Sequence, residues 1–174
     1  MDLTQQYFLT SFRFDKTTAA DFGLVPSAEQ ADLFIRPSDG SIWKKKKLYD
    51  FGWGNEVGFV KQPELDFEGL WFLLLNSELQ ANEYGAASEL LEQYPEELLT
   101  RVEQLLTANK GSGLEPKQTR AFRILKLELP LNRSKTIGKS SEQIGRDFDR
   151  WRAVSEKISA LSERKARRRW WKFW

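Results

Sequence analysis

Cysteine and histidine are both absent from this sequence of 174 residues. Without cysteine the chain can form no disulfide and perform no thiol chemistry. Without histidine it lacks the commonest general base and transition-metal ligand, and zinc sites built from Cys and His are excluded. Carboxylate sites for Mg²⁺ or Ca²⁺ and Asp/Glu acid–base pairs remain open. We therefore expect a binding protein with no cofactor and no enzymatic activity; a carboxylate-dependent hydrolase is the catalytic alternative.

Long hydrophobic runs are also missing. The longest, Leu70–Leu75, has six residues, whereas a membrane-spanning helix needs about 20. The first residues show no basic segment followed by an apolar one, so we expect no signal peptide and a cytoplasmic location. Hydrophobic residues make up 40% of the chain, enough for the core of a single domain. Within this domain, 1–174, we distinguish a β-rich part (1–62), acidic helices (63–109) and a basic helical part (117–174).

Aromatic residues and turn residues in the first 62 positions predict a small antiparallel sheet. Phe8, Phe12 and Phe14 have the period of two that places side chains on one face of a strand. The apolar run Leu33–Ile35 is followed by Pro37–Gly40, in which Pro and Gly occupy favoured turn positions. We therefore predict a β-hairpin over residues 32–43.

From Gln62 onward the apolar spacing becomes helical. We predict helices over 62–80, 82–94 and 95–109, the first with Pro63 in its first turn. Residues 117–131 fit a helix or a strand, and propensity favours the helix.

Ser140 and Gln143 form a capping box that begins a long helix. If this helix continues into the Arg-rich tail it has about 30 residues, with an apolar stripe formed by Ile144, Phe148, Trp151, Val154, Ile158 and Leu161. The predicted fold class is α+β: a small N-terminal antiparallel sheet packed on a mainly α-helical C-terminal part with a long basic C-terminal helix.

Charge is divided unequally along the chain. Residues 1–110 contain 10 Lys and Arg against 18 Asp and Glu, and residues 111–174 contain 17 against 7. In one interpretation the acidic helices and the basic helix neutralise each other. In the other, the acidic helices form a docking surface for another, basic protein, because complementary charge raises association rates and selects partners. The candidate partner-binding residues are then Glu78, Glu83, Glu89, Glu92, Glu96, Glu97 and Glu103.

Two basic stretches offer other surfaces. Lys44–Lys47 fits the solvated edge of a hairpin or a phosphate-binding patch. The basic and aromatic tail contains Arg164, Arg167, Arg168, Arg169, Trp170, Trp171 and Trp174. Its rings suit packing within the protein or a homodimer, an anionic membrane surface, or stacking on nucleic-acid bases. A peripheral membrane- or nucleic-acid-binding module is therefore the alternative function.

Gly138-Lys139-Ser140 imitates the end of a phosphate-binding loop, G-x-x-x-x-G-K-[ST]. The first glycine of that motif would fall at position 133, which is Arg133. Little chain follows the helix, so no strand is left to supply a magnesium-binding carboxylate. We predict an ordinary capped helix start here and no nucleotide site.

Two segments resemble a known family. Asn82-Glu83-Tyr84-Gly85-Ala86-Ala87-Ser88-Glu89-Leu90-Leu91 followed by Tyr94-Pro95-Glu96-Glu97-Leu98-Leu99 resembles a HEAT-type helical hairpin, as in small bacterial immunity-type proteins, which bind and neutralise toxins. The resemblance covers residues 82–109 and carries no site residue. It implies a protein-binding role in a bacterial cytoplasm. We therefore expect a non-enzymatic protein-binding module, with toxin neutralisation as one version.

Overall fold

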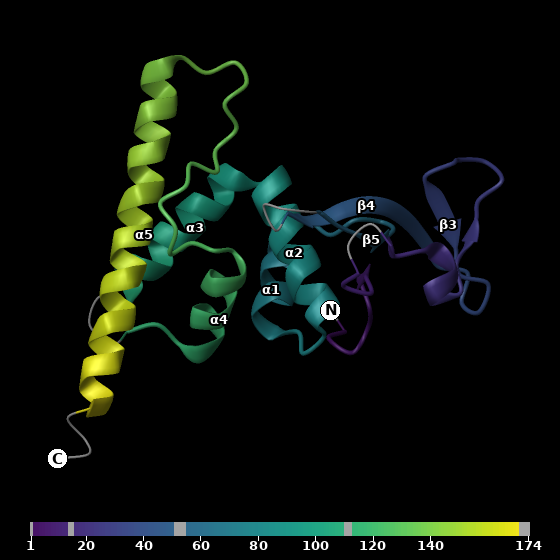
Figure 1. Cartoon of the computed structure of the whole chain (residues 1–174), viewed down its shortest axis with the longest axis horizontal. Helices are drawn as coiled ribbons and strands as arrows, with labels where there is room; N and C mark the ends of the chain where they lie inside the picture. Colours follow the sequence, from purple (N-terminus) through teal and green to yellow (C-terminus); the bar gives the residue numbers. More distant parts are fainter. Residues whose placement is uncertain (1, 14–15, 51–54, 110–112, 171–174) are drawn as a thin grey trace. The chain divides into compact units, whose positions relative to one another are not determined.

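In a computed structural model the chain forms two compact units, Met1–Leu90 and Leu91–Trp174, which we call unit 1 and unit 2 (Figure 1). The structure describes residues 2–13, 16–50, 55–109 and 113–170, with the side chains of 49, 50, 55 and 162–170 left out. The fold class is α+β, as the sequence predicts. Within the described residues, unit 1 contains a five-stranded antiparallel sheet, and the chain has five α-helices.

The sheet of unit 1 has the strand order β1-β5-β4-β3-β2. Its elements are β1 (Phe8–Leu9), the 3₁₀ helix η2 (Ala19–Phe22), β2 (Val25–Pro26), β3 (Leu33–Ile35), β4 (Ile42–Asp50) and β5 (Asn55–Lys61). The predicted hairpin is confirmed, because β3 and β4 pair antiparallel across the Pro37–Gly40 turn. Gly40 has a φ of 69°, a left-handed conformation that glycine adopts without strain.

The predicted first strand is wrong in its extent. β1 ends at Leu9, and Phe12 has a φ of 52°, which breaks the extended backbone that a period of two requires. The Phe12 ring instead packs edge-on against Tyr84, with ring centroids 5.7 Å apart. Phe14 lies outside the described residues.

The two faces of the sheet pack differently. On one face Leu9, Leu24, Trp43 and Phe59 form a buried cluster beside η2. On the other, Phe8 packs against Gly85 of α2 (Gln80–Gln93). One small cavity on this face is lined by Phe8 of β1, Val60 of β5 and Leu70 of α1 (Phe67–Asn76). Unit 1 is therefore a sheet with helices on one face and a short 3₁₀ segment on the other.

Helix α1 begins later than the sequence predicts. Pro63 was expected in its first turn, but the first helical residue is Phe67. Asp66 caps this start, because its carboxylate accepts a hydrogen bond of 2.8 Å from the Gly69 amide, the usual role of Asp at an N-cap. The late start leaves Glu64 in the connection between β5 and α1.

Unit 2 contains α3 (Pro95–Ala108), α4 (Pro116–Ile124) and α5 (Ser141–Trp170). Helix α5 has 30 residues, and the predicted capping box is present, since Gln143 N–H donates to Ser140 Oγ at 3.3 Å and Ser140 N–H to Gln143 Oε1 at 2.8 Å. Trp151, Val154 and Ile158 of its stripe are buried.

Phe148 lies at the margin of that stripe and stays 37% exposed. The sequence of residues 117–131 fits either a helix or a strand. In the structure they form α4 up to Ile124 and then turns. Lys126, with a φ of 52°, ends any continuation of the helix.

Candidate functional site

The predicted acidic face is smaller in the structure than in the sequence. Glu83 and Glu89 are buried, so they cannot form a surface for a partner. Glu96 and Glu103 form ion pairs within unit 2. Glu78, Glu92 and Glu97 are exposed. Glu83 and Glu89 are misassigned because helical spacing does not reveal which side of an acidic helix faces the rest of its unit.

Lys46 joins two carboxylates inside unit 1. Its ammonium donates to Glu64 Oε2 and to Glu89 Oε2, each at 2.8 Å, and the Glu89 side chain is only 2% exposed. Burial lowers the pKa of Lys46, but these hydrogen bonds outweigh that effect and the pKa is raised above its ordinary value. Lys46 therefore fastens β4 to α2 and to the chain before α1.

The other three lysines of the run differ from Lys46 in their exposure and their partners. Strand β4 is interior up to Lys44, where it pairs with both β3 and β5. The Lys45 amide still donates to the Asp32 carbonyl at 3.0 Å, and the described ladder beyond that point is with β5. Lys44 lies 3.8 Å from Asp32, and Lys45 and Lys47 are exposed. Alternation along the strand separates Lys46 from these exposed neighbours, so the run is not one patch.

In unit 2 Lys139, two residues before α5, neutralises one carboxylate of α3 and one of α5. Lys139 donates to Glu96 at 2.7 Å and to Asp147 at 2.6 Å. Hydrogen bonds to Asp147 and Glu96 raise the pKa of Lys139. The lysine of the segment Gly138-Lys139-Ser140, which resembles the end of a phosphate-binding loop, is therefore bound to two carboxylates.

Arg150 makes a second link between α3 and α5. Its guanidinium donates to both Glu103 oxygens, at 3.2 and 2.7 Å, and this bond raises the pKa of Arg150. A bidentate pair of this kind fixes geometry as well as charge. The interpretation in which acidic and basic helices pair internally therefore holds for Glu96 and Glu103.

The basic and aromatic tail is helical in its first part. The backbone of α5 continues to Trp170, so the predicted length of the helix is confirmed. The side chains of Arg164, Arg167–Arg169 and Trp170 are not described, and Trp171 and Trp174 lie outside the described residues. Their predicted roles stay predictions.

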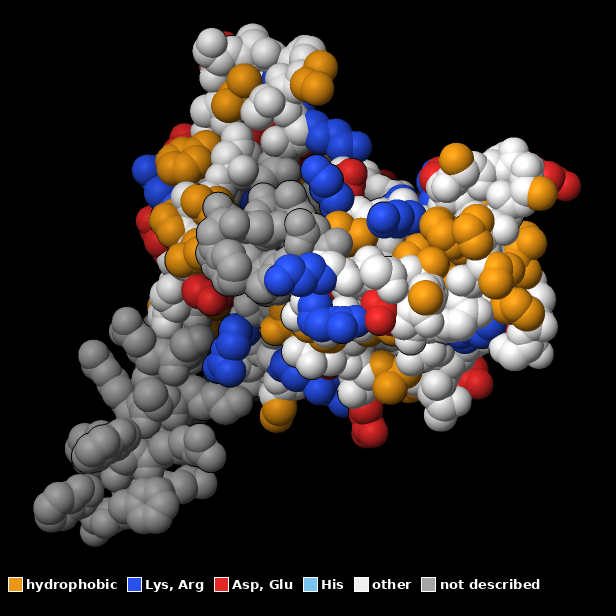
Figure 2. Space-filling model, turned by 45° about the vertical axis from the view of Figure 1, so that its right-hand side comes forward, with side chains coloured by type: hydrophobic (Ala, Val, Ile, Leu, Met, Phe, Trp, Pro, Cys, Tyr) orange, Lys and Arg blue, Asp and Glu red, His pale blue; other side chains and the backbone are white. Residues whose placement is uncertain are grey.

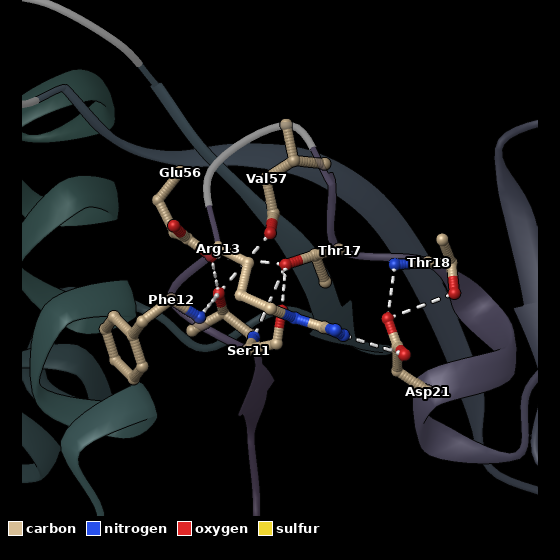
Figure 3. Close-up of polar contacts among 9 residues, drawn as sticks. Ser11, Phe12, Arg13, Thr17, Thr18, Asp21, Glu56 and Val57 are labelled. Carbon is tan, nitrogen blue, oxygen red and sulfur yellow. Dashed lines mark hydrogen bonds and ion pairs between the residues drawn. The ribbon is translucent and has the colours of Figure 1, made fainter.

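A polar network that the sequence did not reveal surrounds Glu56 (Figure 3). Glu56 is buried, and its carboxylate accepts hydrogen bonds from Thr10 Oγ1 and from Thr17 Oγ1, the latter at 3.3 Å. Thr17 and Ser11 hydroxyls lie 2.6 Å apart, and Arg13 Nε donates to Ser11 Oγ at 3.0 Å. Buried polar groups of this kind require partners, and the network fastens the segment after β1 to β5.

The outer end of that network is an ion pair that also caps η2. Arg13 lies 2.8 Å from Asp21, and Asp21 accepts from the Thr18 amide at 2.7 Å. The Thr18 hydrogen bonds and Arg13 lower the pKa of Asp21. The network contains hydroxyls and one buried carboxylate, and every hydroxyl named is bonded to a neighbour. We interpret it as structural.

A row of exposed apolar side chains crosses the sheet of unit 1. Val25 is paired with Ile35, and Ile35 with Ile42, so the three side chains share one face at neighbouring positions. Their exposed fractions are 46%, 37% and 44%. Figure 2 shows hydrophobic side chains gathered over the sheet, on the right of the view. We call Val25, Ile35 and Ile42 the apolar row; the sequence alone could not identify it, because it depends on the register of three strands.

The β1 edge of the sheet is closed by a side chain of α2. Asn82 Oδ1 accepts from the amides of Tyr7 and Phe8 at 2.9 and 3.2 Å, and its Nδ2 donates to the Gln5 carbonyl at 3.0 Å. The amide of Asn82 thus takes the place of a neighbouring strand.

The β2 edge is closed differently. Ser27 N–H donates to Leu33 O, and hydrogen-bonded pairs alternate along an antiparallel ladder, so Leu24 and Pro26 are the positions whose backbone faces outward. The Leu24 N–H donates to Ala19 O at 3.0 Å, and Pro26 has no N–H. An added strand would find no backbone donor at these positions.

We expect Asn82→Ala to destabilise unit 1 by about 2 kcal/mol, because buried backbone amides lose their acceptor. Urea denaturation measures the loss. Asn76→Ala is the matched control: the Asn76 amide donates to the Phe72 carbonyl at an exposed position, and the expected change is about 0.5 kcal/mol. Equal losses in both variants would contradict the assigned role of Asn82.

Among the described residues, no group of three or more Asp or Glu side chains is placed to hold a metal ion. Within the same part of the chain, no helix is long and apolar enough to cross a membrane. No family model, curated protein or solved structure compared with the chain matches it.

Proposed function

We propose that the chain is a cytoplasmic, non-enzymatic protein-binding module, and that the apolar row of unit 1 is its contact surface. The observation that carries this proposal is the exposure of three adjacent β-branched side chains, Val25, Ile35 and Ile42, on one sheet face. Contiguous exposed apolar side chains are typical of interaction sites. Isolated exposed apolar residues are not typical of such sites. Strand pairing makes Val25, Ile35 and Ile42 contiguous.

The closed sheet edges restrict how a partner binds. Asn82 occupies the β1 edge, and Pro26 lies at the β2 edge without an N–H. Both therefore disfavour a partner that adds a strand. An amphipathic helix needs no backbone hydrogen bonds from the sheet, since it contributes only an apolar stripe. We therefore assign the apolar row to a partner helix.

Three carboxylates of the acidic face predicted from the sequence are exposed: Glu78 in unit 1, and Glu92 and Glu97 in unit 2. They support attraction of a basic protein, of which a neutralised toxin is one version. Exposed charges of this kind act mainly on the association rate and its salt dependence. We assign the affinity to the apolar row and the steering to these carboxylates.

Cross-linking from the apolar row tests the proposal. Because the chain has no cysteine, Ile35→Cys provides a single site for a benzophenone maleimide, and Phe72→Cys, at a similarly exposed position of α1, is the matched control. After irradiation in an extract of the source cells, we expect one dominant cross-linked protein from position 35 and not from position 72. The purified partner should then bind Ile35→Asp about 30-fold more weakly than the unmodified chain, as for an interface hot spot.

Two outcomes would overturn the assignment. One is the same set of cross-linked products from both positions. The other is unchanged affinity of the identified partner for Ile35→Asp, measured by calorimetry, while circular dichroism shows that the variant is folded.

A further inference from the structure

A connection of turns and loops in unit 2, which we call the strap, joins α4 to α5 over residues 128–139. Its inward positions bond to α5: Asn132 Nδ2 donates to the Ile144 carbonyl at 3.5 Å, and Ser134 Oγ accepts from Trp151 Nε1 at 3.1 Å. Asn132 and Ser134 therefore fasten the middle of the strap to α5.

Three exposed positions of the strap carry large aliphatic side chains. Leu129, Leu131 and Ile137 are 45%, 49% and 96% exposed. Leu125 and Leu127, just before the strap, are buried, so the unit has a core that these three residues do not enter. Covering these side chains would remove apolar surface from water, which is favourable.

The sequence around these side chains is strongly basic. Residues 116–138 contain six Lys and Arg and one Glu; the next lysine, Lys139, is paired with Glu96 and Asp147. Lys117, Arg120 and Arg123 of α4 are exposed and recur every third residue, which places them on one side of a helix. Lys135 lies on the strap itself, between Leu131 and Ile137, and is also exposed. Basic residues therefore precede the strap on α4 and also lie within it.

We propose that unit 2 binds the surface of an anionic phospholipid bilayer, with Leu129, Leu131 and Ile137 entering the headgroup region and the basic residues of α4 and the strap contacting the phosphates. Basic residues near such a surface each strengthen binding, and aliphatic side chains at the acyl boundary add apolar burial. Base stacking needs planar side chains, which Leu129, Leu131 and Ile137 do not have, so these three side chains suit a bilayer better than nucleic acid. This inference is independent of the apolar row in unit 1.

The tail contributes a second, sequence-level observation. Residues 164–169 contain five Lys and Arg, and Trp170, Trp171 and Trp174 follow. Tryptophan beside basic residues suits the interface of an anionic bilayer. We expect the tail to add to the binding that the strap provides.

Vesicle sedimentation of the full chain tests the proposal. We expect binding to vesicles of 70% phosphatidylcholine and 30% phosphatidylserine, and at least about tenfold weaker binding to phosphatidylcholine alone, since several basic residues contribute. The triple variant Leu129→Ser, Leu131→Ser, Ile137→Ser should bind the anionic vesicles at least about tenfold more weakly. Phe148→Ser, which removes an exposed apolar side chain of α5, is the matched control and should bind normally.

Fluorescence locates the contact. Because the chain has no cysteine, Ile137→Cys carries a single environment-sensitive dye, which should shift to shorter wavelength on anionic vesicles. The same dye on Gln104→Cys, an exposed position of α3, should not shift. Circular dichroism of the triple variant verifies its fold.

Four results would overturn the proposal. The first is equal binding of the folded triple variant and the unmodified chain, which would assign any binding to the tail alone. The second is no dye shift at position 137. The third is binding to single-stranded nucleic acid but not to vesicles. The fourth is a homodimer, detected by light scattering, that dissociates in the triple variant.

Discussion

Lys46→Met is expected to lower the free energy of unfolding of unit 1 by about 3 kcal/mol, because it removes a cation from between two carboxylates. The Lys46 ammonium donates 2.8 Å hydrogen bonds to both Glu64 and Glu89. Hydrogen bonds to charged groups contribute more than neutral ones. Glu89 is buried, so water screens this charge poorly.

The next lysine of the same strand is the matched control. Lys45 is exposed, and Lys45→Met should change the stability by less than about 0.5 kcal/mol. The double variant Lys46→Met, Glu89→Gln should lose less than the sum of its two single variants, because the residues interact directly. Urea denaturation of the unmodified chain and of the four variants measures these differences. Equal losses for Lys45→Met and Lys46→Met would contradict a specific role for Lys46.

The dependence on pH has a definite sign. The pKa of Lys46 is raised in the folded chain, so its contribution is fully present below the unfolded value of about 10.4 and is lost as the pH rises through the folded value. The difference between the unmodified chain and Lys46→Met should therefore stay constant from neutral pH to about 10 and then shrink. A difference that widens above that pH would contradict the assignment.

Local signals in the sequence account for the features that were predicted correctly. The Pro37–Gly40 turn and the Ser140–Gln143 capping box each depend on residues a few positions apart. Such signals need no knowledge of the remaining fold. The same holds for α2 and α3, whose bounds, Gln80–Gln93 and Pro95–Ala108, lie close to the predicted ones.

Pairings between distant residues could not be read from the sequence. Lys46 meets Glu64 and Glu89 from 18 and 43 residues away, and nothing in a run of four lysines distinguishes the one that is enclosed. Charge counts showed an acidic stretch and a basic stretch, but not which carboxylates are buried. The apolar row has the same origin, since Val25 and Ile42 become neighbours only through Ile35.

Gly85 is a sequence signal of close packing. Gly85 lies inside a predicted helix, where glycine is unfavourable and often marks a close approach. In the structure a Cβ at this position would overlap the Phe8 ring. Gly85 therefore predicts contact between its helix and another element, although not which element.

Gly58→Ala is expected to destabilise unit 1 by about 3 kcal/mol or more, because the added methyl group has no space. A Cβ on Gly58 would overlap the backbone carbonyl of Leu9 and the Cδ1 atom of Leu48. Leu9 belongs to β1, which pairs with β5 through Phe59, so relief of the overlap requires β1 to move. Leu48 is buried beside the irregularity between Lys47 and Tyr49 and has little room to turn.

The same substitution at Gly145 should have the opposite effect. Gly145 lies in α5 with nothing within 4 Å of an added Cβ, and alanine in a helix is favoured over glycine by about 1 kcal/mol. Thermal unfolding measures the expected loss of stability in Gly58→Ala and the expected gain in Gly145→Ala. Hydrogen exchange of the β4 and β5 amides assigns the Gly58→Ala loss to unit 1. Because the β1 edge is also where Asn82 binds the Tyr7 and Phe8 amides, displacement of β1 should speed exchange at those amides too. The prediction is contradicted if Gly58→Ala has unchanged stability and its Tyr7 and Phe8 amides exchange as slowly as in the unmodified chain. That result would mean that the Leu9 carbonyl lies farther from Gly58 than the structure shows.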